Sequence, residues 1–395
     1  MWSRYSRFLP ELFSVAAVAL AHYYLYVWLM ESGRMKNLQN RGRRVVQVAF
    51  AASLVFVCTG ITFQIPGLSR MLAYSEWQIW ARGLAIAFGM CTCMFFLLAC
   101  AVRLSGRIIP AGKELNPMRR KVLRAGANAV LAAPLAITGF AIIVERQRFV
   151  FKELEIGIPN LAKDLQGLRL VQLTDMHVSP FLTVKELARA VDMANEAKAD
   201  VTLVTGDLIT NTGDPLDGCL RELSRLRANG GVFGCMGNHE IYARCEDYVA
   251  REAALLGMRF LRQETQTLRF GNASLNLAGV DYQRFGDVYL AGAERMISAD
   301  PRTLNILLSH NPDVFPIAAS QGWDLTFAGH THGGQVTFEL LSRHLNVARF
   351  YTKYVQGLYE LSGKSIFVSR GLGTVGVPAR IGAPPEVALI KLCAT

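Results

Sequence analysis

Residues 329–335 read GHTHGGQ, and they follow directly on the apolar run Leu325–Ala328. A short apolar run bounded by turn residues is typical of a buried strand. The glycines on both sides of His330 and His332 allow tight turns and leave space beside the two imidazoles. Two histidines at this spacing, placed at the end of a strand, indicate a metal-binding site.

The same arrangement occurs four more times upstream, where polar residues end a predicted strand. The predicted strands cover 168–174, 201–205, 231–236 and 304–309, and their polar ends are Asp175-Met176-His177, Gly206-Asp207, Gly237-Asn238-His239-Glu240 and Ser309-His310. Together with GHTHGGQ, these strand ends contain five of the seven histidines of the chain. One such motif alone is usually a turn or a helix cap, but five of them predict a single ligand-binding edge.

The rest of the C-terminal part alternates in the same way between strands and helices. Amphipathic segments at 184–197, 216–227 and 240–256 separate the apolar runs. This alternation predicts an α/β layered domain, which we place at 155–395.

The ligand types specify the chemistry. Imidazole nitrogen and carboxylate oxygen suit Mn, Fe or Zn, and the absence of cysteine from the motifs argues against a structural zinc site. Two divalent cations can clamp the attacking and leaving oxygens of an in-line displacement at phosphorus, and they lower the pKa of a bound water to provide hydroxide. The expected cofactors are therefore two divalent metal ions, which a carboxylate has to bridge because bare dications repel each other.

Taken in order, these motifs resemble the calcineurin-like metallophosphoesterase superfamily. The run SRGLGT at 369–374 and the closing strand PPEVALIKL at 384–392 are similar to the branch whose bacterial members follow a membrane segment. The resemblance implies a four-layer β-sandwich flanked by helices. It also implies that His239 is catalytic, as proton donor to the leaving group or stabiliser of the transition state. The implied metal ligands are Asp175, His177 and His332 for the first ion, Asn238, His310 and His330 for the second, and Asp207 as the bridge.

Three further residues have two interpretations each. Arg370, in the SRG turn, is predicted either to neutralise the substrate phosphate or to form a structural salt bridge. Tyr282 and Arg284 lie in a loop between predicted strands, where they either line the pocket or serve only as loop residues.

Residues 1–150 differ sharply in composition from the rest. They carry 18 Lys and Arg against 5 Asp and Glu, a net charge of +13, whereas residues 151–395 have a net charge of −2. Four apolar stretches, at about 8–30, 45–63, 79–102 and 122–144, are long enough to cross a bilayer. The positive charge lies between these stretches and not on the folded domain, so the chain is predicted to bind membrane lipid and no nucleic acid.

The loops between the predicted spans suggest an orientation. Basic residues concentrate at 34–44 and at 103–121, which places both loops in the cytoplasm and the catalytic part outside it, in the periplasm of a bacterial inner membrane. Basic residues at 4–7 and 146–148 oppose this orientation. Members of the branch are similar to enzymes that cleave the pyrophosphate of a lipid A precursor, but that reaction is cytoplasmic and conflicts with the predicted side.

The leading hypothesis is a membrane-anchored phosphoesterase acting on a phosphate mono- or diester, with a lipid-linked substrate favoured over a soluble nucleotide. One alternative is a non-catalytic scaffold or sensor with the same fold, which would have lost ligands that are all present here. A transporter is disfavoured because no predicted span carries a central charged cluster. The sequence does not specify the oligomeric state.

Overall fold

The computed structural model describes residues 9–31, 35, 39–62, 75–108, 117–283, 289–340 and 343–395. Its contacts divide the chain into two compact units. The first is a helical unit within Met1–Ile143, and the second is a mixed unit that covers Val144–Val375 and Ala379–Thr395.

The helical unit contains four long helices: α2 (Leu9–Met30), α4 (Asn40–Thr62), α6 (Glu76–Ile108) and α7 (Pro117–Ile143). Among the described residues, two segments are long and apolar enough to cross a membrane, Asn40–Gly60 of α4 and Glu76–Ala101 of α6. The prediction of four spans is therefore not confirmed. The apolar part of α2 is the shorter Val15–Met30.

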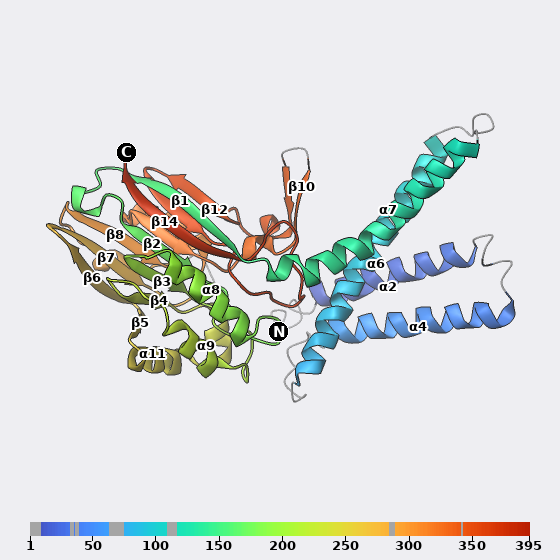
Figure 1. Cartoon of the computed structure of the whole chain (residues 1–395), viewed down its shortest axis with the longest axis horizontal. Coiled ribbons are helices and arrows are strands. Elements are labelled where there is room, and N and C mark those ends of the chain that lie inside the picture. The colour runs from blue at the N-terminus through green and yellow to red at the C-terminus, as the bar shows by residue number, and fades with distance from the viewer. Residues whose placement is uncertain are drawn as a thin grey trace. The chain divides into compact units, whose positions relative to one another are not determined.

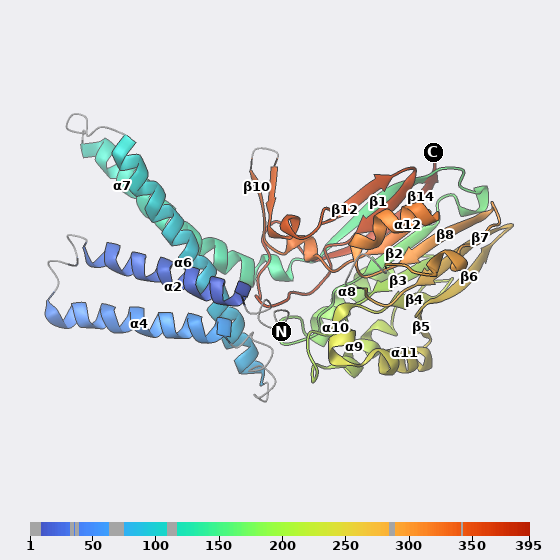
Figure 2. The same ribbon diagram turned by 180° about the vertical axis from the view of Figure 1, so that it is seen from behind.

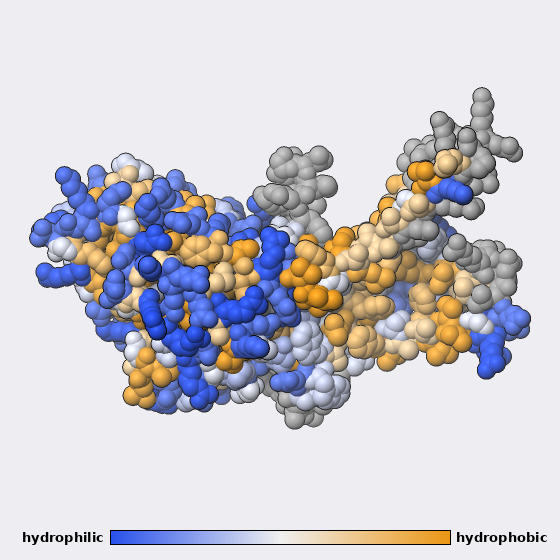
Figure 3. Space-filling model, viewed as in Figure 1, coloured by the Kyte–Doolittle hydropathy of each residue, from blue (hydrophilic) through white to orange (hydrophobic). Residues whose placement is uncertain are grey.

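The first turns of α7 carry Arg119, Arg120, Lys121 and Arg124, and the rest of the helix, residues 125–143, has no charged residue. Apolar side chains gather over the surface of this unit, whereas hydrophilic ones dominate the surface of the mixed unit (Figure 3).

The first sheet of the mixed unit has the strand order β1-β14-β2-β3-β4-β5. Strands β2 to β5 run parallel, β14 is antiparallel to β2, and β1 pairs in parallel with β14. The bounds are β1 Val150–Ile158, β2 Arg169–Leu173, β3 Val201–Thr205, β4 Val232–Cys235, β5 Met258–Phe260 and β14 Glu386–Ala394. The first strand begins at Val150, before the boundary predicted at 155.

The second sheet has the strand order β12-β13-β9-β8-β7-β6. Strands β7, β8, β9 and β13 are parallel, and antiparallel strands close both edges. The bounds are β6 Glu264–Phe270, β7 Ala273–Gly279, β8 Thr303–Leu308, β9 Leu325–Ala328, β12 Gly357–Leu361 and β13 Lys364–Val368. A separate hairpin pairs β10 (Thr337–Leu340) with β11 (Arg343–Asn346).

The two sheets pack face to face, and helices cover their outer faces (Figures 1 and 2). Apolar side chains of both sheets, such as Leu203 and Phe327, form the buried layer between them. A second core lies between the first sheet and the helices α8 (Val184–Glu196), α9 (Leu216–Leu223) and α11 (Glu246–Leu255). The helix α12 (Phe315–Gln321) packs on the second sheet. The predicted two-sheet α/β sandwich with flanking helices is confirmed.

The helix predicted at 240–256 is divided into two. The helix α10 (Asn238–Ala243) ends at Arg244, whose backbone is left-handed with φ 55°, and α11 then begins at Glu246. A residue with left-handed backbone angles cannot continue a right-handed helix. The break places Asn238 and His239 on the first turn of a short separate helix directly after β4.

Candidate metal centre

Five strands from the two sheets end near one another, and each is followed by one of the polar motifs. From the first sheet these strands are β2, β3 and β4, and from the second they are β8 and β9. Within each sheet the strands are parallel, so their carboxyl ends lie on the same edge. The motif residues therefore come together although up to 157 positions separate Asp175 from His332 in the sequence.

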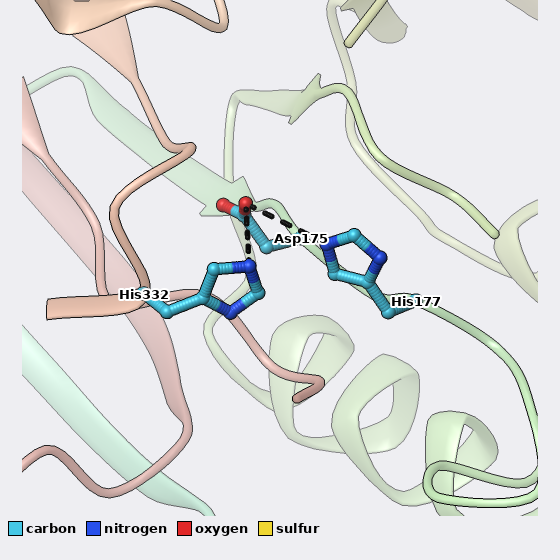
Figure 4. Close-up of side chains that lie close together, drawn as sticks. All are labelled: Asp175, His177 and His332. Atoms are coloured by element: carbon cyan, nitrogen blue, oxygen red, sulfur yellow. Dashed lines mark ion pairs between the residues drawn. The ribbon is translucent and has the colours of Figure 1, made fainter. Parts of the chain in front are cut away.

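One group of side chains consists of Asp175, His177 and His332 (Figure 4). The Asp175 carboxylate lies between the two rings, with Oδ1 3.4 Å from His332 Nε2 and 4.0 Å from His177 Nε2. All three side chains are buried. They are the residues predicted to hold the first metal.

A second group consists of Asp207, His310 and His330. The Oδ2 atom of Asp207 lies 3.1 Å from His310 Nε2, and the His310 and His330 rings are 5.1 Å apart between centroids. Asn238 is buried at the start of α10. This group contains the predicted bridge Asp207 and two of the three ligands predicted for the second metal, His310 and His330.

The two groups meet at the Asp207 carboxylate. Its Oδ2 atom lies 3.3 Å from His177 Nε2 in the first group as well as 3.1 Å from His310 Nε2 in the second. Asp175 Oδ1 is similarly close to both groups, since it lies 3.8 Å from His310 Nε2. Both carboxylates thus occupy the position that a bridging ligand needs.

A test of whether these residues fit metal ions is whether their donor atoms are already used. Burying a polar atom without a partner costs about 1–3 kcal/mol, so a cluster of such atoms requires an explanation. Five buried nitrogen and oxygen atoms of the predicted ligands have no hydrogen-bond partner among the described residues: His177 Nε2, Asn238 Oδ1, His310 Nε2, His330 Nδ1 and His332 Nδ1. Two of them, His177 Nε2 and His310 Nε2, converge on Asp207 Oδ2, and imidazole nitrogens that meet at a buried carboxylate fit divalent cations.

The backbone of the site is strained in a way that a packing role does not require. Five of the seven predicted ligands adopt the left-handed region, with φ between 46° and 74°: Asp175, His177, Asp207, His330 and His332. Such conformations are unfavourable for residues with a Cβ atom and concentrate at functional sites. The backbone conformation therefore points to selection for the direction of these side chains.

Two glycines make the close approach of these turns possible. A Cβ atom on Gly237 would lie 2.2 Å from Asp207 Oδ1, and one on Gly329 would lie 2.3 Å from Asp175 Oδ2. Any larger residue at either position would displace a carboxylate of the site.

Backbone carbonyls set the tautomer of two histidines. The His310 ring donates from Nδ1 to the Thr205 carbonyl at 2.7 Å, which directs Nε2 toward Asp207. The His239 ring donates from Nδ1 to the Thr210 carbonyl at 2.6 Å, so its Nε2 atom remains to carry or accept a proton. The backbone amide of His239 donates to Asp207 Oδ1 at 2.8 Å. His239 also stands close enough to His177 and Asp207 to be a ligand itself.

Glu240 positions the loops that carry the ligands. Its buried carboxylate accepts hydrogen bonds from the amides of Gly237 at 2.8 Å, Asp207 at 2.9 Å and Leu208 at 2.7 Å. It therefore ties the turn after β3 to the turn after β4. Glu240 belongs to the motif Gly237-Asn238-His239-Glu240, but nothing in the sequence marks it for this role.

Charge interactions prepare the groups for cations. Burial opposes ionisation of Asp207, but His310 and His177 outweigh burial and hold the pKa of Asp207 well below its usual range. Burial also disfavours a charge on His310, yet Asp207 and Asp175 raise its pKa to about 10. Burial lowers the pKa of His330 to about 3, so this imidazole is neutral at physiological pH. A cation that enters has to displace the proton of His310.

Arg370 forms the salt bridge that was one of its two interpretations. Its Nε atom donates to Glu386 Oε2 at 2.7 Å, its backbone amide donates to Glu386 Oε1 at 2.9 Å, and Glu386 is buried. Tyr282 lies at the site, with its hydroxyl 3.5 Å from His330 Nε2. Arg284 lies outside the described residues.

Arg380 belongs to the surroundings of the site and was not singled out in the sequence. Its guanidinium is completely buried and donates to a set of backbone carbonyls, those of His332, Arg370, Gly371, Gly373 and Ala383. The turn that it holds contacts the first motif, because the amide of Gly373 donates to the Asp175 carbonyl at 2.7 Å. No periodicity or local motif marks such a residue.

Comparison with known proteins agrees with this geometry. The family model of the calcineurin-like phosphoesterases matches residues 168–334, a range that includes all five motifs. The chain is 31% identical to an uncharacterized metallophosphoesterase of Aquifex aeolicus over 57% of this chain and 85% of that protein. The chain belongs to the calcineurin-like phosphoesterase family.

Two further relatives differ in how much of their length is shared. An uncharacterized metallophosphoesterase of Campylobacter jejuni is 31% identical to this chain. The matched region covers 61% of this chain and only 62% of the length of that relative. A transmembrane protein with metallophosphoesterase domain from Bos taurus is 25% identical over 87% of this chain and 78% of that protein. Similarity to the bovine protein thus extends beyond the phosphoesterase domain.

Proposed function

We propose that the protein is a hydrolase that uses two divalent cations to cleave a phosphate mono- or diester. The observation that carries the proposal is the convergence of buried imidazole nitrogens on two carboxylates, with His177 Nε2 and His310 Nε2 beside Asp207 and His332 Nε2 beside Asp175. Asp175, His177 and His332 would hold one ion. The ligands of the other would be Asn238, His310 and His330, with Asp207 between them. When bound, such a pair supplies Lewis acidity at phosphorus and a water of lowered pKa.

The protein groups supply orientation and proton transfer. The Thr205 and Thr210 carbonyls hold the His310 and His239 rings in one tautomer each. His239 is less buried than His177 and Asp207 beside it, and its Nδ1 atom is occupied by the Thr210 carbonyl, so Nε2 is the ring atom left for the substrate. We infer that this atom gives its proton to the leaving alkoxide or binds a phosphate oxygen as negative charge develops.

Phosphate release from soluble and lipid esters tests the function directly. The full chain in detergent with Mn²⁺, Fe²⁺ or Zn²⁺ is expected to hydrolyse p-nitrophenyl phosphate or its bis ester, or a phospholipid headgroup, and metal analysis is expected to find two ions for each chain. A chain that binds no metal and hydrolyses none of these esters would be better described as a scaffold.

Replacing His239 shows whether it acts as a general acid or as a metal ligand. His239→Asn is expected to lower kcat by about 10²–10⁴-fold, the usual contribution of a general acid, while two metals remain bound. Tyr242→Phe is the control, because Tyr242 is exposed and its ring lies 5.6 Å from that of His239. Loss of one metal from the His239→Asn variant would make His239 a ligand and not the acid.

Removing the metals is expected to destabilise the fold. Without cations the buried donor atoms stay unpaired, so we expect chelation to lower the midpoint of thermal unfolding by about 10 °C, on the basis of about 4 kcal/mol for a ligand at 1,000 times its Kd. Scanning fluorimetry of the full chain before and after EDTA, with Mn²⁺ added back, measures this. An unchanged midpoint would argue against bound metal.

We further propose that the helical unit anchors the enzyme in the membrane. The two long apolar segments in α4 and α6 support this, as does the similarity to a protein named for its transmembrane part. The basic segments at 34–44 and 103–121 favour a cytoplasmic position for those loops. A crossing by α7, the fourth span predicted from the sequence, would then place the phosphoesterase domain in the periplasm if the source is bacterial. A reporter that is active on one side only, fused at Thr395, tests the side.

A further inference from the structure

One corner of the mixed unit exposes aromatic and basic side chains together. We call it the aromatic corner and define it as Arg349, Phe350, Tyr351 and Lys353. Phe350 is 88% exposed and Tyr351 is 84% exposed, the highest values among the large hydrophobic side chains of the described residues. Arg349 and Lys353 beside them are also exposed. Two neighbouring aromatic rings in water lose hydrophobic free energy, so their exposure calls for a partner.

The amino-terminal side of the aromatic corner is fixed to the turn that carries His332. Asn346 is buried, and its Nδ2 atom donates to the Gly333 carbonyl at 2.7 Å and to Thr337 Oγ1 at 2.7 Å. Its Oδ1 atom accepts from the Ala348 amide and thereby caps the short helix η7 (Val347–Phe350). The corner therefore begins three residues after a side chain bonded to the metal-site turn.

The carboxyl-terminal side is fixed as well. Thr352 donates from its hydroxyl to Asp313 Oδ1 at 2.5 Å and accepts from the Tyr354 amide at 3.0 Å. The Tyr354 ring then packs edge-on against Phe315 and Tyr359. Phe350 and Tyr351 thus project from a stretch that is held at both ends and cannot turn inward without breaking these bonds.

The composition of the corner suits one kind of partner, the headgroup region of a bilayer. Aromatic rings are favoured at that depth, where the apolar ring and the polar tip of a tyrosine each meet a matching environment. Basic side chains of such a segment bind anionic headgroups, and their aliphatic stems tolerate the apolar side. The same chain carries helices suited to cross a membrane, which would hold the mixed unit within reach of a lipid surface.

We propose that the aromatic corner docks into the headgroup region of the membrane and presents the centre built on His332 to a phosphate ester that lies in the lipid surface. This inference rests on the proposed function for the chemistry, but the docking itself does not depend on it. The substrate class that follows is a phospholipid or lipid-linked phosphate, whose scissile group is at headgroup depth.

Photocrosslinking tests the docking without any assay of activity. The full chain is placed in nanodiscs of phosphatidylcholine and phosphatidylglycerol, with Phe350→p-benzoylphenylalanine as the probe. We expect a lipid adduct at this position by mass spectrometry. The same probe at Leu255, which is 76% exposed at the end of α11, is expected to give none, and at Val55 in α4 it reports contact with the bilayer core.

No lipid adduct at position 350 while the Val55 probe reacts would overturn the docking. An adduct with a second protein chain in place of lipid would also overturn it.

A kinetic comparison tests the consequence for substrate. The double variant Phe350→Ser, Tyr351→Ser is expected to lose about tenfold in turnover of phosphatidic acid in nanodiscs, because surface docking no longer aligns the site with the headgroup. Its turnover of soluble p-nitrophenyl phosphate is expected to stay within about twofold of the wild type. An equal loss on both esters would overturn the role in substrate presentation. A wild-type chain that cleaves neither ester would overturn the proposed function, while the crosslink would still decide the docking.

Discussion

Asp207→Asn is expected to lower phosphoesterase turnover by about 10³-fold or more, since Lewis-acid stabilisation is worth several kcal/mol and each 1.4 kcal/mol is tenfold. Oδ2 of Asp207 lies between His177 Nε2 and His310 Nε2, at 3.3 and 3.1 Å. An amide is neutral, so two cations at this position would repel each other more strongly. The amide NH₂ group also cannot serve as a ligand on the side to which it points.

Metal content gives this variant a second measurement. We expect the bound metal to fall from two ions to one or fewer for each chain, as measured on the purified full chain by mass spectrometry of the metals. Asp192→Asn is the matched control, because Asp192 is an exposed carboxylate on α8 that pairs with Arg225. If the Asp207→Asn variant kept its turnover and both metals, another residue would have to be the bridge, and Asp175 would be the first candidate.

Arg380→Met is expected to destabilise the protein by about 3–5 kcal/mol, the usual cost of removing a buried charge that its surroundings satisfy. The side chain is fully buried, and methionine leaves the carbonyls of Gly373 and Ala383 without donors. Burial lowers the pKa of Arg380 to about 9, so the guanidinium still carries its charge at neutral pH. No carboxylate of the described residues forms an ion pair with it, so its partners are backbone dipoles.

The same variant is expected to weaken metal binding. The turn that Arg380 holds places the amide of Gly373 on the Asp175 carbonyl, and a Cβ atom on Gly371 would lie 2.5 Å from Asp175 Cβ. Loosening this turn frees Asp175, and outer-shell changes of this kind cost about 10–100-fold in metal affinity.

Thermal unfolding and Mn²⁺ titration measure the two effects of Arg380→Met separately. Arg380→Lys is the informative companion, because a single ammonium group cannot reach carbonyls spread over both sides of a planar fork. Arg221→Met, at an exposed arginine of α9, is the neutral control. Equal stability and equal metal affinity in Arg380→Met and wild type would contradict the structural role.

The strands that carry the site were predictable because each is a short run of apolar residues that ends in a polar motif. The runs Val201–Thr205 and Leu325–Ala328 appear in the structure with the predicted bounds, since short apolar runs buried on both faces are marked by composition alone. The predicted helix 240–256 failed at Arg244, because a left-handed residue in mid-segment depends on the contacts that surround it. The four predicted spans are confirmed only in part, since two segments of the described residues, in α4 and α6, are long and apolar enough to cross a membrane.

The sequence by itself determined the residue types of the candidate site, their positions after strands and the family to which the chain belongs. These are local properties, because a ligand and the turn that carries it need only a few neighbouring residues. The tertiary structure alone decided that Glu240 ties two turns together, that Arg370 pairs with Glu386, and that Arg380 lies buried among carbonyls. Each of these depends on residues far apart in the chain, whose pairing no local pattern encodes. Only packing of the two sheets determines which distant groups meet at the edge where the site lies.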